Sequence, residues 1–154
     1  MFISKTLKVN LVLFTLFLPF ILAPVAAETG LGKATETEIS LVDGIAVDKK
    51  GNFYITLREH NVINRIDTKG IMTRFAGSGE SGFSGDNGPA VNAKLKTPAS
   101  LAFDTKGNLY IADRENHRVR KIDTKGHVST FAGTGEAGFS GDGGAAEKAQ
   151  LNLP

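Results

Sequence analysis

The sequence predicts an all-β fold made of two four-stranded antiparallel units of the kind that form the blades of a β-propeller. One observation is a long internal repeat: residues 43–98 return without a gap as residues 99–154, with 29 of 56 positions identical. A fixed period of this length indicates stacked supersecondary units. The other observation is that each copy holds four short segments rich in Ile, Val, Phe and Tyr, separated by turn signals, which is typical of β-strands.

The expected strands occupy matching positions in the two copies. They cover residues 44–48, 52–57, 62–67 and 71–76 in the first copy, and residues 100–104, 108–113, 118–123 and 127–132 in the second. Propeller blades are the architecture that repeated four-stranded antiparallel units favour. A solenoid of parallel strands is the alternative, but tight antiparallel hairpins fit it poorly.

Four turns of the form Asp-x-Lys-Gly define these hairpins, and they begin at Asp48, Asp67, Asp104 and Asp123. Asp hydrogen-bonds the backbone ahead of it, and Gly at the fourth position takes the positive φ that closes the hairpin. Because the chain reverses at every turn, these four turns must share one face. The Arg-Glu turns in the middle of each unit and the long connectors at residues 77–98 and 133–154 must then share the other face.

The N-terminal residues 1–27 have the pattern of a secretory signal peptide. Lys5 and Lys8 precede an apolar run, and the small residues at positions 25–27 offer a cleavage site. An uncleaved membrane anchor is the alternative, although the run is short and is interrupted by Pro19 and Pro24. We therefore expect export, to the periplasm, the cell surface or the medium, and no membrane span after cleavage.

The predicted organisation is a signal peptide (1–27), a mature N-terminal segment (28–42), a first blade with its connector (43–98) and a second blade with its connector (99–154). We expect the segment 28–42 to be flexible, with residues 37–41 as a possible extra strand. Without the two leader lysines, 16 basic and 16 acidic residues remain. This neutral balance argues against a nucleic-acid partner, and the lack of Cys excludes disulfides and thiolate metal sites.

A family resemblance rests on residues 107–122, which read GNLYIADRENHRVRKI. This stretch resembles an NHL repeat, and the connector FAGTGEAGFSGDGGAAEKAQLNLP resembles a bacterial subtype that is also similar to the NHL segment of teneurins. The resemblance covers residues 43–154. It implies a propeller of about six blades, so we expect this two-blade chain to need either further blades or self-association to close a ring.

The two copies differ at several signature positions. Leu57 stands where the second copy has Asp113, and His60-Asn61 stands where the second has Asn116-His117. The first copy is therefore a degenerate repeat. The histidines are candidate metal ligands, as in lyase members of the wider propeller group, but they are one position out of register, which favours a structural role.

The remaining candidates lie on the face of the Arg-Glu turns and connectors. Asp86 and Asp142 could belong to calcium loops, but too few acids surround them, and a turn-stabilising role is favoured. Phe83 and Phe139 are either contact anchors or, as we expect, tucked under their glycine-rich loops. The complete candidate interaction face is Arg58, Glu59, His60, Asn61, Phe83, Asp86, Arg114, Glu115, Asn116, His117, Phe139 and Asp142.

Two functions of different classes follow. The first is a non-catalytic binding scaffold for a protein or glycan ligand, with no cofactor and no metal. The second is part of a propeller enzyme, a metal-dependent lyase or lactonase. The sequence contains no evident Ser-His-Asp set or close pair of acids, which favours the scaffold. RNA binding, known in some NHL proteins, is disfavoured by the expected export and the neutral charge.

Overall fold

The computed structural model describes residues 30–36, 39 and 41–154. The signal peptide expected at residues 1–27 lies outside these residues, as does most of the possible strand at residues 37–41. Within the part of the chain that is described, no helix is both long and apolar enough to cross a membrane.

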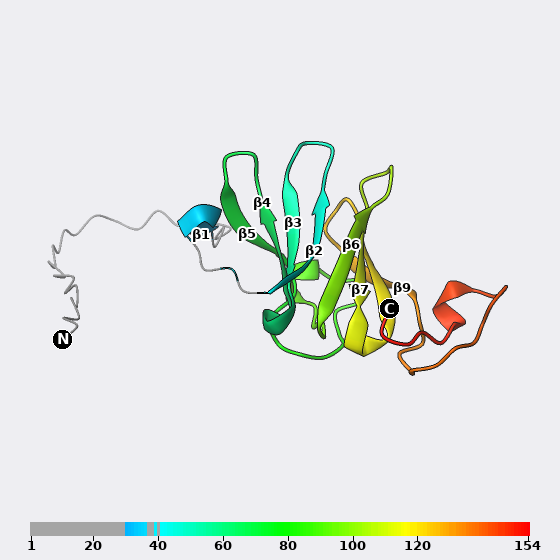
Figure 1. Cartoon of the computed structure of the whole chain (residues 1–154). Coiled ribbons are helices and arrows are strands. Elements are labelled where there is room, and N and C mark those ends of the chain that lie inside the picture. The colour runs from blue at the N-terminus through cyan, green and yellow to red at the C-terminus, as the bar shows by residue number, and fades with distance from the viewer. Residues whose placement is uncertain (1–29, 37–38, 40) are drawn as a thin grey trace, which may run out of the picture.

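Two antiparallel sheets stand side by side, and each contains one blade (Figure 1). Blade 1 is formed by β2 (Val42–Val47), β3 (Phe53–Leu57), β4 (Val62–Ile66) and β5 (Ile71–Ala76). Blade 2 is formed by β6 (Pro98–Phe103), β7 (Leu109–Asp113), β8 (Arg118–Ile122) and β9 (Val128–Ala132). The all-β fold with two propeller-type blades is thus confirmed, and the strand boundaries move by only one or two residues.

The Asp-x-Lys-Gly turns form as their sequence requires. In the first, the N–H of Gly51 donates to the Asp48 carbonyl at 3.0 Å, and Asp48 Oδ1 accepts from the N–H groups of Lys50 and Asn52 at 2.9 Å each. Gly51 has a φ of 85°, which a side chain would disfavour. The turns lie at the upper ends of the sheets in Figure 1, and the Arg-Glu turns and the first connector lie at the lower ends.

The main core lies between the blades. Tyr54 of blade 1 meets Phe75 and Phe103 edge-on, with ring centroids 4.8 and 4.9 Å apart. Buried apolar side chains from both blades and the first connector surround this group: Ile63, Ala76, Ala90, Ala93, Leu95, Leu109, Ile111, Ile122 and Val128. Each large side chain buried here contributes about 1.5–3 kcal/mol, so this interface holds the two blades together.

The inner strands β2 and β6 approach each other closely, and one glycine permits it. A Cβ at Gly44 would collide with the carbonyl oxygen of Ala99 on β6. Thr56 on β3 fixes the same point, because its hydroxyl accepts the N–H of Gly44 at 2.7 Å. The two blades therefore meet along their inner edges.

A fifth strand covers the outer edge of blade 1. β1 (Gly30–Lys33) pairs antiparallel with β5 and leads into the 3-10 turn η1 (Ala34–Glu36), where the N–H of Ala34 donates to the Gly70 carbonyl at 2.9 Å. The expectation of a flexible segment is wrong for residues 30–36. They pair with blade 1 as the end of the first connector pairs with blade 2. The N–H of Ala90 donates to the Gly126 carbonyl at 2.9 Å, and both residues lie 56 positions after Ala34 and Gly70.

Candidate functional site

A polar groove lies between the two Arg-Glu turns. These turns are the short 3-10 helices η2 (Arg58–His60) and η4 (Arg114–Asn116). The cavity between them measures about 330 Å³ and is lined by Arg58, Glu59, Asn61, Ser81, Thr97, Arg114 and Glu115. We call these seven residues the Arg-Glu groove. It brings together five of the candidates that the sequence placed on this face.

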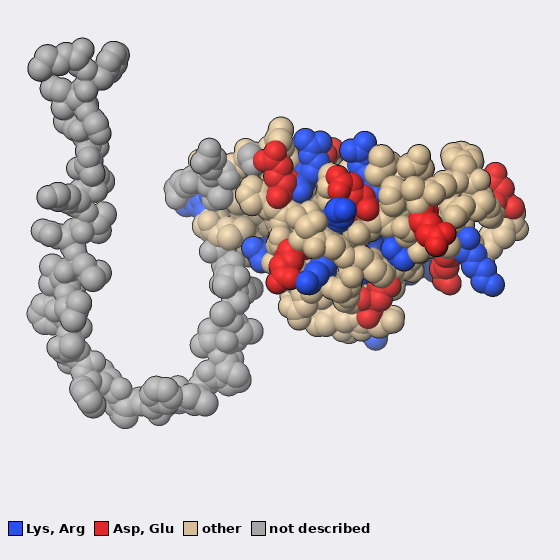
Figure 2. Space-filling model, turned by 90° about the horizontal axis from the view of Figure 1, so that it is seen from below, with Lys and Arg blue, Asp and Glu red and all other residues tan. Residues whose placement is uncertain are grey.

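The groove carries both signs of charge, only partly paired. Arg58 contacts Asp43 at 3.1 Å, and Lys96 contacts Glu115 at 3.5 Å. Among the described residues, the side chains of Glu59 and Arg114 make no hydrogen bond or ion pair. Figure 2 shows acidic and basic groups interspersed over this underside of the molecule. The groove can therefore offer a guanidinium donor and a carboxylate acceptor to a polar ligand.

Asn61 and His117 have the same structural role, despite being different residue types. Both end a 3-10 turn in the left-handed region, with φ values of 53° and 51°, which Asn and His tolerate better than most residues. Asn61 Oδ1 accepts the N–H of Thr97 at 3.0 Å, and His117 Nδ1 accepts the N–H of Leu153 at 3.2 Å. Each side chain therefore fastens the last residues of a connector to its own blade, and the structure gives His117 a structural role.

The residue immediately before Asn61 or His117 makes different contacts in the two blades. Asn116 is buried and donates to Asp113 Oδ2 and to the Gly82 carbonyl, both at 2.8 Å. His60 occupies the same position in blade 1 and is exposed. Its neighbour Leu57, in the place of Asp113, offers no acceptor. Among the described residues, no group of three or more His, Asp or Glu side chains lies close enough to hold a metal ion.

The first connector is fastened to blade 2 by a buried network that the sequence analysis missed. Arg120, whose side chain is 0% exposed, contacts Asp113 Oδ2 at 3.3 Å and Asp86 Oδ1 at 2.6 Å. Asp86 Oδ2 also accepts from the Thr130 hydroxyl at 2.7 Å. Burial raises the pKa of Asp113, although the Lys96 N–H, Asn116 and Arg120 all favour its charged form. Asp86 therefore joins the connector to blade 2 rather than stabilising a local turn.

Phe83 completes this attachment. Its ring lies under two guanidinium groups, 3.9 Å from that of Arg118 and 4.7 Å from that of Arg120. Such cation–π contacts contribute about 0.5–2 kcal/mol each. We call Asp113, Arg118 and Arg120 of blade 2 the arginine socket. Phe83 and Asp86 are engaged in it, so both attach the first connector to blade 2.

The second connector has no such socket to enter. Phe139 is 95% exposed, against 42% for its counterpart Phe83. Asp142 makes no hydrogen bond or ion pair with any described residue. The expectation that both phenylalanines are tucked under their loops is wrong for Phe139, because the contacts that hold Phe83 come from the following blade.

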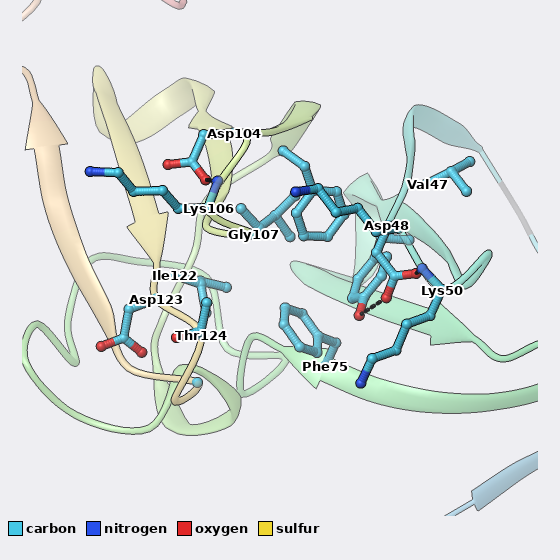
Figure 3. A pocket seen from close by; sticks show the side chains of 15 residues that line it. Val47, Asp48, Lys50, Phe75, Asp104, Lys106, Gly107, Ile122, Asp123 and Thr124 are labelled. Atoms are coloured by element: carbon cyan, nitrogen blue, oxygen red, sulfur yellow. Dashed lines mark hydrogen bonds between the residues drawn. The ribbon is translucent and has the colours of Figure 1, made fainter.

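A second cavity of about 330 Å³ lies on the opposite face, among the Asp-x-Lys-Gly turns (Figure 3). Tyr54, Phe75 and Phe103 line it, and Lys49, Lys50 and Lys106 are among its charged lining residues. Its carboxylates are occupied: burial would raise the pKa of Asp48, but hydrogen bonds from Asn52, Lys50 and Tyr54 together lower it. This cavity was not predicted from the sequence. The aromatic residues beside the repeated turns were the signal for it.

The architecture and its repeated connectors define the class of protein: two blades of a β-propeller. Comparisons with known proteins specify the type. Residues 79–140 match the family model described as the Teneurin NHL domain. The chain is 38% identical to human Teneurin-4 over 117 residues. The aligned region covers 67% of this chain and 4% of Teneurin-4. The resemblance to NHL repeats and to the teneurin segment is therefore confirmed.

Solved structures agree with this assignment. An auxiliary nutrient binding protein from Bacteroides ovatus superposes with a TM-score of 0.61 and 25% identity, covering 77% of this chain and 32% of that one. A structural genomics protein of unknown function from Bacteroides thetaiotaomicron gives a TM-score of 0.60 and 29% identity, covering 68% and 26%. The chain thus spans about a third or less of each solved structure and a small fraction of the teneurin.

Proposed function

We propose that this chain is part of an exported, non-catalytic binding scaffold, and that a polar ligand, a protein or a glycan, occupies the Arg-Glu groove. The observation that carries the proposal is the groove itself, in which Glu59 and Arg114 remain unpaired within the described chain. Other candidates on this face, such as Phe83, Asp86 and Asn116, already have structural partners.

Three further points support this function. A groove that presents both a carboxylate and a guanidinium matches ligands rich in hydroxyl, amide or charged groups. The pattern of residues 1–27 fits export. One structurally similar protein is described as an auxiliary nutrient binding protein, which is consistent with recognition of a ligand outside the cell.

The test is a binding screen of the purified chain against a glycan array and a peptide array, followed by single variants. Arg114→Ala and Glu59→Ala should each lower the affinity for any ligand found by about 10–100-fold, since a hydrogen bond to a charged group contributes about 1.5–3 kcal/mol. Lys106→Ala, in the cavity on the opposite face, is the matched control and should leave affinity unchanged.

The opposite pattern would contradict the proposal. Loss of binding in Lys106→Ala with full binding in Arg114→Ala would place the ligand in the cavity of Figure 3 instead. Chemical turnover of a bound ligand would favour the enzyme alternative, a metal-dependent lyase or lactonase.

A further inference from the structure

The cavity among the Asp-x-Lys-Gly turns has an aromatic lining that the fold itself holds in place. The ring of Tyr54 meets those of Phe75 and Phe103 edge-on, and all three line the cavity. The Tyr54 hydroxyl donates to Asp48 Oδ2 at 3.3 Å, a hydrogen bond that the dashed line in Figure 3 marks. Because the same rings belong to the core between the blades, the cavity does not need a ligand in order to form.

The acidic residues of the lining have their acceptor positions largely filled. Asp48 accepts four hydrogen bonds: two from backbone N–H groups, one from the Asn52 amide and one from Tyr54. Asp104 accepts the four corresponding bonds one repeat later. Asp123, the third acid, accepts two backbone N–H groups through Oδ1. A carboxylate has about four lone-pair sites, so Asp48 and Asp104 have none left for a donor on a ligand.

The lysines of the same turns provide positive charge without a partner. The side chains of Lys50 and Lys106 make no hydrogen bond or ion pair with any described residue. One comes from each blade, and they lie on opposite sides of the cavity in Figure 3. Lys49 differs from them, because its Nζ donates to the Thr105 carbonyl at 2.6 Å and so links the two turns. The cavity therefore combines an aromatic lining with two free ammonium groups.

We infer that this cavity binds a small amphipathic anion, and that an aromatic monocarboxylate is the simplest ligand of this class. The ligand ring packs against Tyr54, Phe75 and Phe103, and its carboxylate accepts hydrogen bonds from Lys50 or Lys106, whose long stems can turn toward it. A volume of about 330 Å³ is within the range of small-ligand sites. This is a second site, and the inference does not rest on the ligand of the Arg-Glu groove.

The experiment titrates the purified chain with phenylacetate and follows the backbone amide signals by heteronuclear NMR. The signals of Gly107 and Gly126, which line the cavity, should shift and reach saturation. Gly70 closes an identical Asp-Thr-Lys-Gly turn but does not line the cavity, so its signal should stay in place. Acetate, which has the charge but no ring, should give no saturable shift over the same concentrations.

The contribution of the charge is measured with a neutral ligand and with variants. Phenylacetamide should bind about 3–10-fold more weakly than phenylacetate, since ion pairs with exposed lysines contribute modestly. Lys50→Gln with Lys106→Gln should lower the affinity for phenylacetate by a similar factor and leave that for phenylacetamide unchanged, which also shows that the cavity is intact. The matched control is Lys69→Gln with Lys148→Gln, which removes the same charge outside the cavity and should leave both affinities unchanged.

Several results would overturn the inference. Equal affinities for phenylacetate, phenylacetamide and phenethylammonium would show that the cavity does not select an anion. Equal losses in the two double variants would assign the effect to the overall charge of the chain. Saturable shifts at Ser81 and Thr97 without any at Gly107 would place the anion in the Arg-Glu groove, and a titration without saturable shifts would exclude the site. None of these results bears on the groove ligand, which Arg114→Ala tests separately.

Discussion

Blade 1 and blade 2 share a backbone pattern but hold their outer segments by different chemistry. Blade 2 receives the first connector through a buried ion pair, Arg120 with Asp113, and through Asp86. At the corresponding positions, blade 1 has an apolar cluster that includes Leu57 and is packed against Ala34 of the N-terminal segment. The same architecture thus tolerates either an ionic or an apolar attachment, provided that all members of the set change together.

The largest expected effect is the loss of stability when the buried ion pair of blade 2 is broken. Arg120→Ala removes the partner of Asp113, whose side chain is 0% exposed, and leaves a buried carboxylate uncompensated. Breaking such a pair typically costs about 3–5 kcal/mol. Urea titration followed by circular dichroism measures the loss in the free energy of unfolding.

The double variant Asp113→Leu with Arg120→Asn is the control, because it carries the residues of blade 1. It should lose less stability than Arg120→Ala alone, because the buried carboxylate of Asp113 is removed together with its arginine. Asp86 loses Arg120 in both variants, but it is 31% exposed and still accepts from the Thr130 hydroxyl. A double variant that is less stable than the single one would refute the view that the two blades use interchangeable attachments.

Substitutions in the apolar attachment of blade 1 should cause the next largest loss of stability. Leu57 is 8% exposed and packs with Ile55, Val62 and Met72. Leu57→Ala should cost about 2–4 kcal/mol through the cavity it leaves. Leu57→Asp should cost more, because it places the carboxylate of blade 2 in a site that lacks the arginine. An aspartate variant as stable as the alanine variant would argue against this difference between blades.

A smaller loss of stability is expected at the position where the two blades hold their connectors in the same way. His117 and Asn61 both hold a connector end from a left-handed backbone position. His117→Asn should change stability by less than about 0.5 kcal/mol. His117→Ala should cost about 1–2 kcal/mol, because it loses the acceptor for the Leu153 N–H and places Ala at positive φ. Thermal melts of the two variants side by side measure this, and equal losses would argue against a shared role.

The sequence predicted the parts of this fold that depend on local chemistry. Strands followed from runs of β-branched and aromatic residues, and hairpins followed from Asp and Gly at fixed turn positions. The alternation of turns also predicted which loops share a face, and five residues of the Arg-Glu groove were among the candidates for it. These features can be predicted because they depend on residues that are close together in the sequence.

The features that were missed depend on distant partners. Asp86 and Arg120 are 34 positions apart in the sequence, so neither residue indicates the ion pair by itself. The joint change of Leu57, Val62 and Asn64 into Asp113, Arg118 and Arg120 was the available signal, since an acid and two bases appear together. β1 was missed because its glycine-rich segment has weak strand propensity and is held by its pairing with β5.

The smallest expected effect concerns pH and contrasts the turns with the socket. Hydrogen bonds from Asn108 hold the pKa of Asp104 below its ordinary value of 3.8, whereas burial raises that of Asp113. The stabilisation from Asp104 is present above pH 3.8 and is lost as the pH falls through its lowered folded pKa. The contribution of Asp113 has the opposite sign: it favours folding most at acid pH and weakens as the pH rises from 3.8 through its raised pKa.

Urea titrations between about pH 3 and pH 7 separate these contributions. Asp104→Asn keeps a side-chain acceptor for the turn, and it should make the loss of stability toward acid pH shallower. Asp113→Asn lowers stability overall but should make the loss toward acid steeper than in the parent chain, because it removes the group that binds protons more tightly when folded. The same change of slope in both variants would show that the socket carboxylate titrates like an exposed turn residue, and would contradict its burial in the network around Arg120.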